Sequence, residues 1–202
     1  MLVRRSILLA VGLVLYGLSL TLLVRADLGL SPWDVFHEGF ADVIGWSLGW
    51  TIVLTSFIVL ALWIPIRERP GVGTVANAVV VGVAVEVFTE LIPTIDRLWL
   101  QWVVLALGIV VNGIATGMYI GAGMGPGPRD GLMTGIARRR GSIRVVRTAI
   151  EIAVLLTGIA LGGTFGVGTI VYAVLIGPLA QIFLPIFTRI GRGQPALRPA
   201  SV

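Results

Sequence analysis

Cysteine and lysine are both absent from this chain, and histidine occurs only once, at position 37. Without cysteine the protein cannot form disulfides, thiolate metal sites or a cysteine nucleophile. The sequence also contains neither a His-Glu-x-x-His zinc motif nor a Gly-x-Ser-x-Gly nucleophile elbow. We therefore expect no enzyme activity, no metal site and no cofactor.

Charge is scarce as well. Charged residues make up 12% of the chain against 56% hydrophobic residues, and the mean hydropathy is +0.99. Soluble domains are typically about a quarter charged, so this chain must be solvated partly by the lipid bilayer. The net charge of +5 is the difference between fifteen arginines and ten acidic residues. Because these lie beside apolar runs, we interpret them as topology signals and expect no nucleic-acid partner.

Six apolar runs are long enough to span a bilayer, which takes about 20 residues. They cover approximately 6–24, 48–66, 73–92, 98–120, 144–162 and 167–188. Two shorter and more polar segments, 31–46 and 127–142, have proline in second position and aspartate two residues later. That pattern suits a helix N-terminus. The sequence thus predicts an all-α membrane protein of about six transmembrane helices plus two half-helices. The first run follows Arg4 and Arg5 as in a signal peptide, but we expect it to be a retained helix.

One segment of the chain occurs twice. GLVLYGLSLTLLVRADLGLSPWD, from Gly12 to Asp34, recurs 96 residues later as GIVVNGIATGMYIGAGMGPGPRD, from Gly108 to Asp130. The matching residues are mainly Gly, Pro and Asp, which have specific backbone and charge roles. Repeated halves are frequent in secondary transporters. We assign a first repeat to 1–96, a second to 97–190 and a flexible tail to 191–202.

The arginines favour one orientation in the membrane. With both termini in the cytoplasm and non-crossing half-helices, most arginines fall on the inner side. These are Arg4, Arg5, Arg67, Arg69, Arg129, Arg138, Arg139, Arg140, Arg144, Arg147, Arg189 and Arg192. Three spans per repeat then make the second half enter upside down, an inverted 3+3 repeat. The alternative is that the half-helices cross, which gives eight short spans and parallel repeats.

The two repeated loops are the leading candidates for a binding site. Each joins a span to a half-helix, whose free N–H groups and partial positive charge would suit an anion or a dipolar solute. The residues we single out are Gly29, Pro32, Asp34, Gly125, Pro128 and Asp130. The alternative is a tight turn in which each aspartate caps its helix and nothing binds. An intramembrane Asp34–Asp130 catalytic pair would require both loops to dip into the bilayer.

Polar residues inside the predicted spans are further candidates. Glu86 is the best candidate for proton or cation coupling, unless it lies near the outer interface. Arg147 and Glu151, four residues apart on one helical face, predict an intrahelical ion pair, with gating or solute contact as the sharper alternative. Asn77, Asn112 and Tyr172 predict interhelical hydrogen bonds, with solute contact as the alternative. We expect His37 and the tryptophans at 46, 50, 63, 99 and 102 at the membrane interface.

The sequence resembles a known family over nearly its whole length, the tail excepted. Five segments carry the resemblance: ADLGLSPWD, RPGVGTVANAVVVG, GMGPGPRDGLMTGIARRRG, RVVRTAIEI and GGTFGVGTIVYAVLIGPLAQ. They resemble the YczE-like branch of the YitT/YczE family of bacterial integral membrane proteins. The resemblance implies a multi-pass protein of the bacterial plasma membrane. It supplies neither a substrate nor functional residues.

We expect a small secondary transporter or channel-like carrier that moves an unidentified small solute by alternating access. Its partners would be the lipid bilayer, that solute and, because six spans make a thin wall, a second copy in a homodimer. The alternative is a non-transporting membrane protein that stabilises or regulates a partner protein.

Overall fold

The computed structural model describes residues 2–193, which form eight α-helices and no strand. The helices are α1 (Leu2–Ala26), α2 (Pro32–Ile44), α3 (Leu48–Ala61), α4 (Val72–Leu91), α5 (Leu98–Gly121), α6 (Pro128–Arg140), α7 (Ile143–Ala160) and α8 (Val167–Gly191). Apart from residues 191–193, the predicted flexible tail lies outside the described residues.

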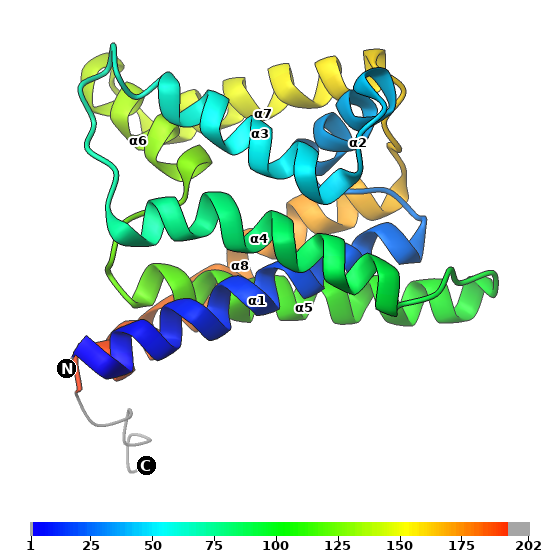
Figure 1. Ribbon diagram of the computed structural model, residues 1–202, viewed down its shortest axis with the longest axis horizontal. Coiled ribbons are helices and arrows are strands. Elements are labelled where there is room, and N and C mark those ends of the chain that lie inside the picture. Colours follow the sequence, from blue (N-terminus) through cyan, green and yellow to red (C-terminus); the bar gives the residue numbers. More distant parts are fainter. Residues whose placement is uncertain (1, 194–202) are drawn as a thin grey trace.

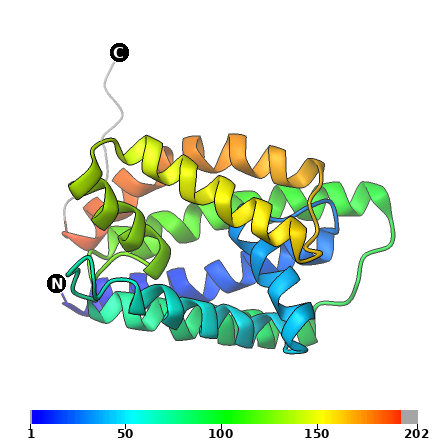
Figure 2. The same ribbon diagram turned by 90° about the horizontal axis from the view of Figure 1, so that it is seen from above.

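The helices form two layers (Figure 1). One layer contains α1, α4, α5 and α8, and the other contains the half-helices α2 and α6 together with α3 and α7. Within the first layer α1 and α5 lie side by side in the middle, α4 packs on α1, and α8 packs on α5 (Figure 2). The second layer is joined to the first where α3 packs on α4. Within the second layer, α2 and α7 pack on each other.

The central helices α1 and α5 run antiparallel. Gly12, near the start of α1, lies against Met118 and Tyr119 near the end of α5, whereas Gly108 lies against Leu22 and Leu23 near the end of α1. Glycine has no Cβ, so it lets the two backbones approach closely where they cross. The order of contacts along the helices therefore fixes their opposite directions.

Both half-helices form where the sequence predicts them. In α2 the side chain of Ser31 accepts a hydrogen bond from the backbone N–H of Asp34, Pro32 occupies the first turn, and Gly45 ends the helix in the left-handed conformation at φ 71°. Proline suits the first turn because that residue has no N–H partner inside the helix. Pro128 begins α6 in the same way, and Gly141 ends it.

Four of the helices are long and apolar enough to cross a membrane by themselves, namely α1, α4, α5 and α8. A fifth span is reached if α2 and α3, which meet at 108°, are counted together. The predicted span 48–66 is shorter in the structure, because α3 has 14 residues and measures about 21 Å. The helix in the region 144–162, α7, carries Arg144, Arg147 and Glu151. Over residues 2–193 the chain is thus an all-helical membrane protein with four to five candidate spans.

One of the predicted interfacial tryptophans is instead part of the core. Trp63 is only 2% exposed, and its Nε1 donates a hydrogen bond to the carbonyl oxygen of Pro128 at 3.0 Å. Gly131 has no side chain, and this leaves room for the indole ring of Trp63. Trp63 therefore connects the end of α3 to the start of α6. Trp46, Trp50, Trp99 and Trp102 are exposed.

Candidate functional site

A cavity of about 290 Å³ lies between the two layers of helices. Every helix except α3 contributes to its wall, as do the residues just before both half-helices. The lining residues are Tyr16, Ser31, Pro32, Trp33, Asn77, Tyr119, Gly127, Arg129, Asp130, Met133, Arg147, Glu151, Tyr172, Ala173, Ile176 and Gly177. The first turns of α2 and α6, which are far apart in sequence, thus contribute to one site. The candidate residues from the sequence that lie in its wall are Pro32, Asn77, Asp130, Arg147, Glu151 and Tyr172.

All three tyrosines of the chain line this cavity. The rings of Tyr16 and Tyr119 meet edge to face, with centroids 5.8 Å apart and planes at 81°. The hydroxyl of Tyr172 donates to Oδ1 of Asn112 at 3.1 Å. Sequence analysis did not identify Tyr16 or Tyr119 as site residues. A feature that could have pointed to them is that all three tyrosines of the chain lie within apolar segments.

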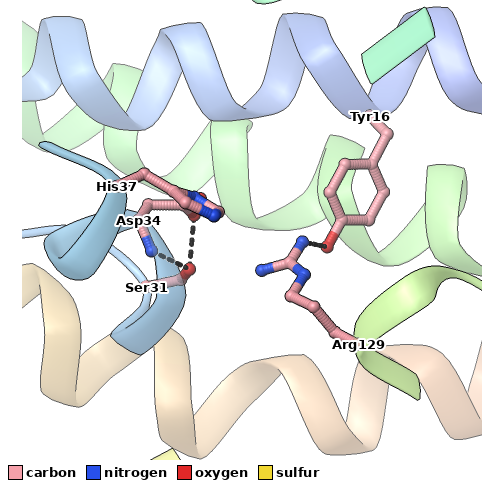
Figure 3. Close-up of polar contacts among 5 residues, drawn as sticks. All are labelled: Tyr16, Ser31, Asp34, His37 and Arg129. Atoms are coloured by element: carbon pink, nitrogen blue, oxygen red, sulfur yellow. Dashed lines mark hydrogen bonds and ion pairs between the residues drawn. The ribbon is translucent and has the colours of Figure 1, made fainter. Parts of the chain in front are cut away.

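Arg129 is the most distinctive polar group of the cavity. Its Nη2 donates a hydrogen bond to the hydroxyl of Tyr16 at 3.0 Å (Figure 3). Its guanidinium carbon lies 5.9 Å from the ring centre of Tyr16 and 5.5 Å from that of Trp33, within cation–π range. Trp33 and Arg129 occupy corresponding positions of the sequence repeat, 96 residues apart. Arg129 is one of the arginines predicted for the inner side of the membrane, and its side chain lines the cavity. The side of the membrane on which it lies stays a prediction.

Two carboxylates of the half-helices are held by neighbouring groups. The hydroxyl of Tyr119 donates to Oδ2 of Asp130. Asp34 is 2% exposed and accepts from the hydroxyl of Ser31, while its Oδ1 lies 3.3 Å from Nδ1 of His37 (Figure 3). Asp34 thus lies behind the cavity wall rather than in it. The interfacial position predicted for His37 was wrong, because this ring is buried with Asp34 and Trp33.

The predicted ion pair on α7 is present. Nε of Arg147 and Oε1 of Glu151 are 2.9 Å apart, and both residues line the cavity. Spaced one helical turn apart, the two charges reduce each other's cost in an apolar setting. They supply the cavity with a dipole on the side opposite α1.

The remaining predicted site residues lie outside the cavity wall. Asn112 is fully buried, and its Nδ2 donates to the hydroxyl of Ser19 at 2.7 Å, so it holds α1, α5 and α8 together. Glu86 accepts a hydrogen bond from the hydroxyl of Ser47 at 2.7 Å, next to the start of α3. Helix N-termini stabilise negative charge, which accounts for this placement. The other three predicted residues, Gly29, Gly125 and Pro128, belong to the loops before the half-helices and to the first turn of α6.

The two loop glycines have a shared structural role. Gly29 and Gly125 both adopt positive φ, 114° and 124°, which favours glycine. Gly29 lies against Gly166 and Thr169 at the start of α8, and Gly125 lies against Gly71 and Thr74 at the start of α4. Each loop also accepts a backbone hydrogen bond, from Gly168 to Leu28 and from Gly73 to Met124. The loops thus anchor the two half-helices to the outer helices of the first layer.

Within residues 2–193, no three histidine or acidic side chains are grouped closely enough to hold a metal ion.

Comparison with known proteins identifies relatives over most of the chain. The pattern of a family of unknown function, DUF6198, matches residues 3–185. The chain is 36% identical over 186 residues to an uncharacterized protein of Haemophilus influenzae, covering 89% of this chain and 85% of the relative. It is 34% identical over 195 residues to the uncharacterized membrane protein YczE of Bacillus subtilis, covering 95% and 90%. Identity to the uncharacterized protein YyaS of the same organism is 25% over 186 residues, covering 89% and 92%. No solved structure matches the chain at a significant level.

Proposed function

This chain belongs to the YczE-like membrane proteins of the family of unknown function DUF6198, and we propose that it is a small secondary transporter. It would bind a small solute in the cavity between the two helix layers and release it on the other side of the bacterial plasma membrane by alternating access. The observation that carries the proposal is the cavity itself, which is polar, lies inside an apolar membrane protein and is lined by both half-helices. Transporters place their substrate sites at such broken helices.

We further propose that the two halves form an inverted 3+3 repeat. The antiparallel packing of α1 on α5 supports this, because corresponding helices of inverted repeats must run in opposite directions. Equivalent contacts support it as well. Gly17 of α1 packs on Ala84 of α4, and its counterpart Gly113 of α5 packs on Leu179 of α8, the residue that corresponds to Ala84.

Both termini would face the cytoplasm. The N-terminus, the end of α5 and the arginine-rich helix α6 lie toward the same end of the molecule (Figure 1). Arg5 donates to the carbonyl oxygen of Ala122 at the end of α5, and Arg138 of α6 pairs with Glu68 at 2.9 Å. Cytoplasmic sides of membrane proteins are rich in arginine, which supports this orientation.

An asymmetry between the halves suggests that the cavity opens between α7 and α8. In the first half α3 packs along α4, whereas among the described residues the corresponding helices α7 and α8 have no comparable packing. Residues of both α7 and α8 line the cavity. Alternating access would bring α7 toward α8 as the second half tilts against the first.

The alternative, a membrane protein that stabilises or regulates a partner, is favoured by the outer face of α8. In the apolar 18-residue stretch of α8 only 6% is buried inside the structure, compared with 39% in the same length of its counterpart α4. That face carries Val174, Ile182 and Ile186. Lipid would cover it in a monomeric carrier, and a second copy or another membrane protein would cover it in the alternative.

Uptake into proteoliposomes tests the transporter. The purified chain would be reconstituted and offered labelled amino acids, sugars, carboxylates and organic cations, with and without a pH gradient. We expect accumulation of at least one solute, and Asp130→Asn should reduce its flux about tenfold or more, because Asp130 lies in the cavity wall. Asp96→Asn is the matched control, since Asp96 is exposed between α4 and α5.

Absence of flux for every solute, together with no shift in thermal unfolding by any of them, would reject the transporter. Site-specific crosslinking from position 174 in cells would then identify what covers α8, and a crosslink to another protein would favour the alternative.

A further inference from the structure

The charges around the cavity are not equally satisfied. The carboxylate of Glu151 is paired with Arg147, that of Asp130 accepts from Tyr119, and that of Asp34 is held by Ser31 and His37. Arg129 differs from all of them. Across the part of the chain that the structure describes, no carboxylate lies within ion-pair distance of its guanidinium.

The guanidinium of Arg129 is held in place, yet most of its N–H groups remain available to bind a ligand. It has five N–H donors, and Tyr16 accepts from one nitrogen. Its guanidinium carbon also lies 5.9 Å from the ring centre of Tyr16 and 5.5 Å from that of Trp33. These contacts fix the planar group in one orientation, and a fixed guanidinium presents two parallel N–H donors that match the two oxygens of a carboxylate.

We propose that this cavity binds a small monocarboxylate, with the carboxylate on Arg129 and an apolar or aromatic body against the tyrosines. This assignment of a substrate class rests on the transporter proposed above. A volume of about 290 Å³ admits a metabolite-sized molecule and is too small for a lipid or a peptide.

The surrounding acids set the charge of the ligand. Asp130 lines the same cavity, and Asp34 lies buried directly behind the first turn of α2. A dianion such as phosphate or a dicarboxylate would meet these two carboxylates with only one unpaired cation to offset its charge. A monoanion pairs with Arg129 and leaves the Arg147–Glu151 ion pair and the hydrogen bonds of Asp130 and Asp34 intact. The three tyrosine rings then provide faces for its carbon skeleton.

Equilibrium binding to the purified full-length chain in detergent tests the substrate class, independently of transport. The probes are radiolabelled acetate, butyrate and benzoate, with inorganic phosphate and methylammonium as competitors. We expect saturable binding of at least one monocarboxylate, no competition by methylammonium and little by phosphate. Arg129→Gln should weaken binding about 10- to 150-fold, the loss expected for a charge-assisted hydrogen bond. Arg97→Gln is the matched control, because Arg97 is exposed at the start of α5.

Arg129→Lys provides a second variant if the glutamine variant does not fold. It keeps the charge and loses the two-pronged geometry, so the carboxylate should bind more weakly than to the natural chain. Absence of binding by all three probes, equal affinity in either Arg129 variant, or stronger competition by phosphate than by benzoate would each overturn the assignment. Carboxylate binding without flux would support this site and reject the transporter. Flux of a different solute without carboxylate binding would support the transporter and reject this site.

Discussion

Replacement of Gly12 by alanine should loosen the central helix pair. A Cβ atom at this position would lie 2.9 Å from Cβ of Met118, 2.9 Å from the backbone nitrogen of Tyr119 and 3.3 Å from the carbonyl oxygen of Ala115. Carbon atoms in contact prefer about 3.5–4.0 Å, so α5 must move away from α1 by several tenths of an ångström or more. Two of the three obstacles are backbone atoms, which cannot rotate aside.

The expected cost follows from two opposing contributions. Overpacking typically destabilises by about 1–3 kcal/mol, and alanine in place of glycine inside a helix returns about 0.5–1 kcal/mol. We therefore expect Gly12→Ala to lower the free energy of unfolding by about 1–2 kcal/mol. The measurement is reversible unfolding in mixed micelles with increasing SDS, followed by helical circular dichroism.

Gly108, the repeat counterpart of Gly12, provides the internal control. The three atoms nearest to a Cβ there are side-chain atoms of Leu22 and Leu23 at 3.1–3.3 Å, and the nearest of them, Cδ2 of Leu23, can move by a change of rotamer. Gly108→Ala should accordingly be neutral or slightly stabilising. If Gly12→Ala were as stable as the natural chain, or if the two variants behaved alike, the inferred close packing of α1 on α5 would be wrong.

Three further substitutions test the contacts that position the cavity. Asn112→Ala removes the amide that accepts from Tyr172 and should destabilise the protein by about 1–3 kcal/mol in the same SDS assay, since a buried polar group loses its partner. Trp63→Phe removes the hydrogen bond to Pro128 and should cost about 1–3 kcal/mol, with increased protease cleavage between α5 and α6. Arg5→Gln removes a cap at the end of α5 and should lower stability by about 0.5–2 kcal/mol at low salt, with a smaller effect in 1 M salt. Unchanged unfolding curves would contradict the first two, and an effect independent of salt would contradict the charge-based account of the third.

Local sequence signals predicted the helices well. Proline in second position with a following aspartate marked the starts of both half-helices, and apolar length marked the long helices. These features depend on residues within one or two turns of each other. Helix length itself was less predictable, because α3 ends at Ala61, where the indole of Trp63 turns inward to reach Pro128. That contact joins residues 65 positions apart, and no local pattern encodes it.

The cavity was predicted only in part. Asp130 could be singled out because aspartate recurs at the same place in both repeated loops, and Asn77 because a polar residue inside an apolar segment is conspicuous. Arg129 was interpreted only as a signal for the cytoplasmic side, because the rule for arginine placement counts charges along the chain and contains no information on side-chain direction. Glu86 was singled out for its position within a span, whereas the structure places it beside Ser47 at the start of α3. Which side of a helix faces the cavity depends on packing between helices distant in sequence.

The contact between Trp33 and Arg129 also bears on why such a protein is one chain. Two identical half-length subunits would carry the same side chain at these matching positions, giving either two guanidinium groups that repel each other or two indoles without charge. A single polypeptide is free of that restriction. Covalent joining of the halves thus lets one copy supply the cation and the other the aromatic ring beside it, so these matched positions hold one guanidinium instead of two or none.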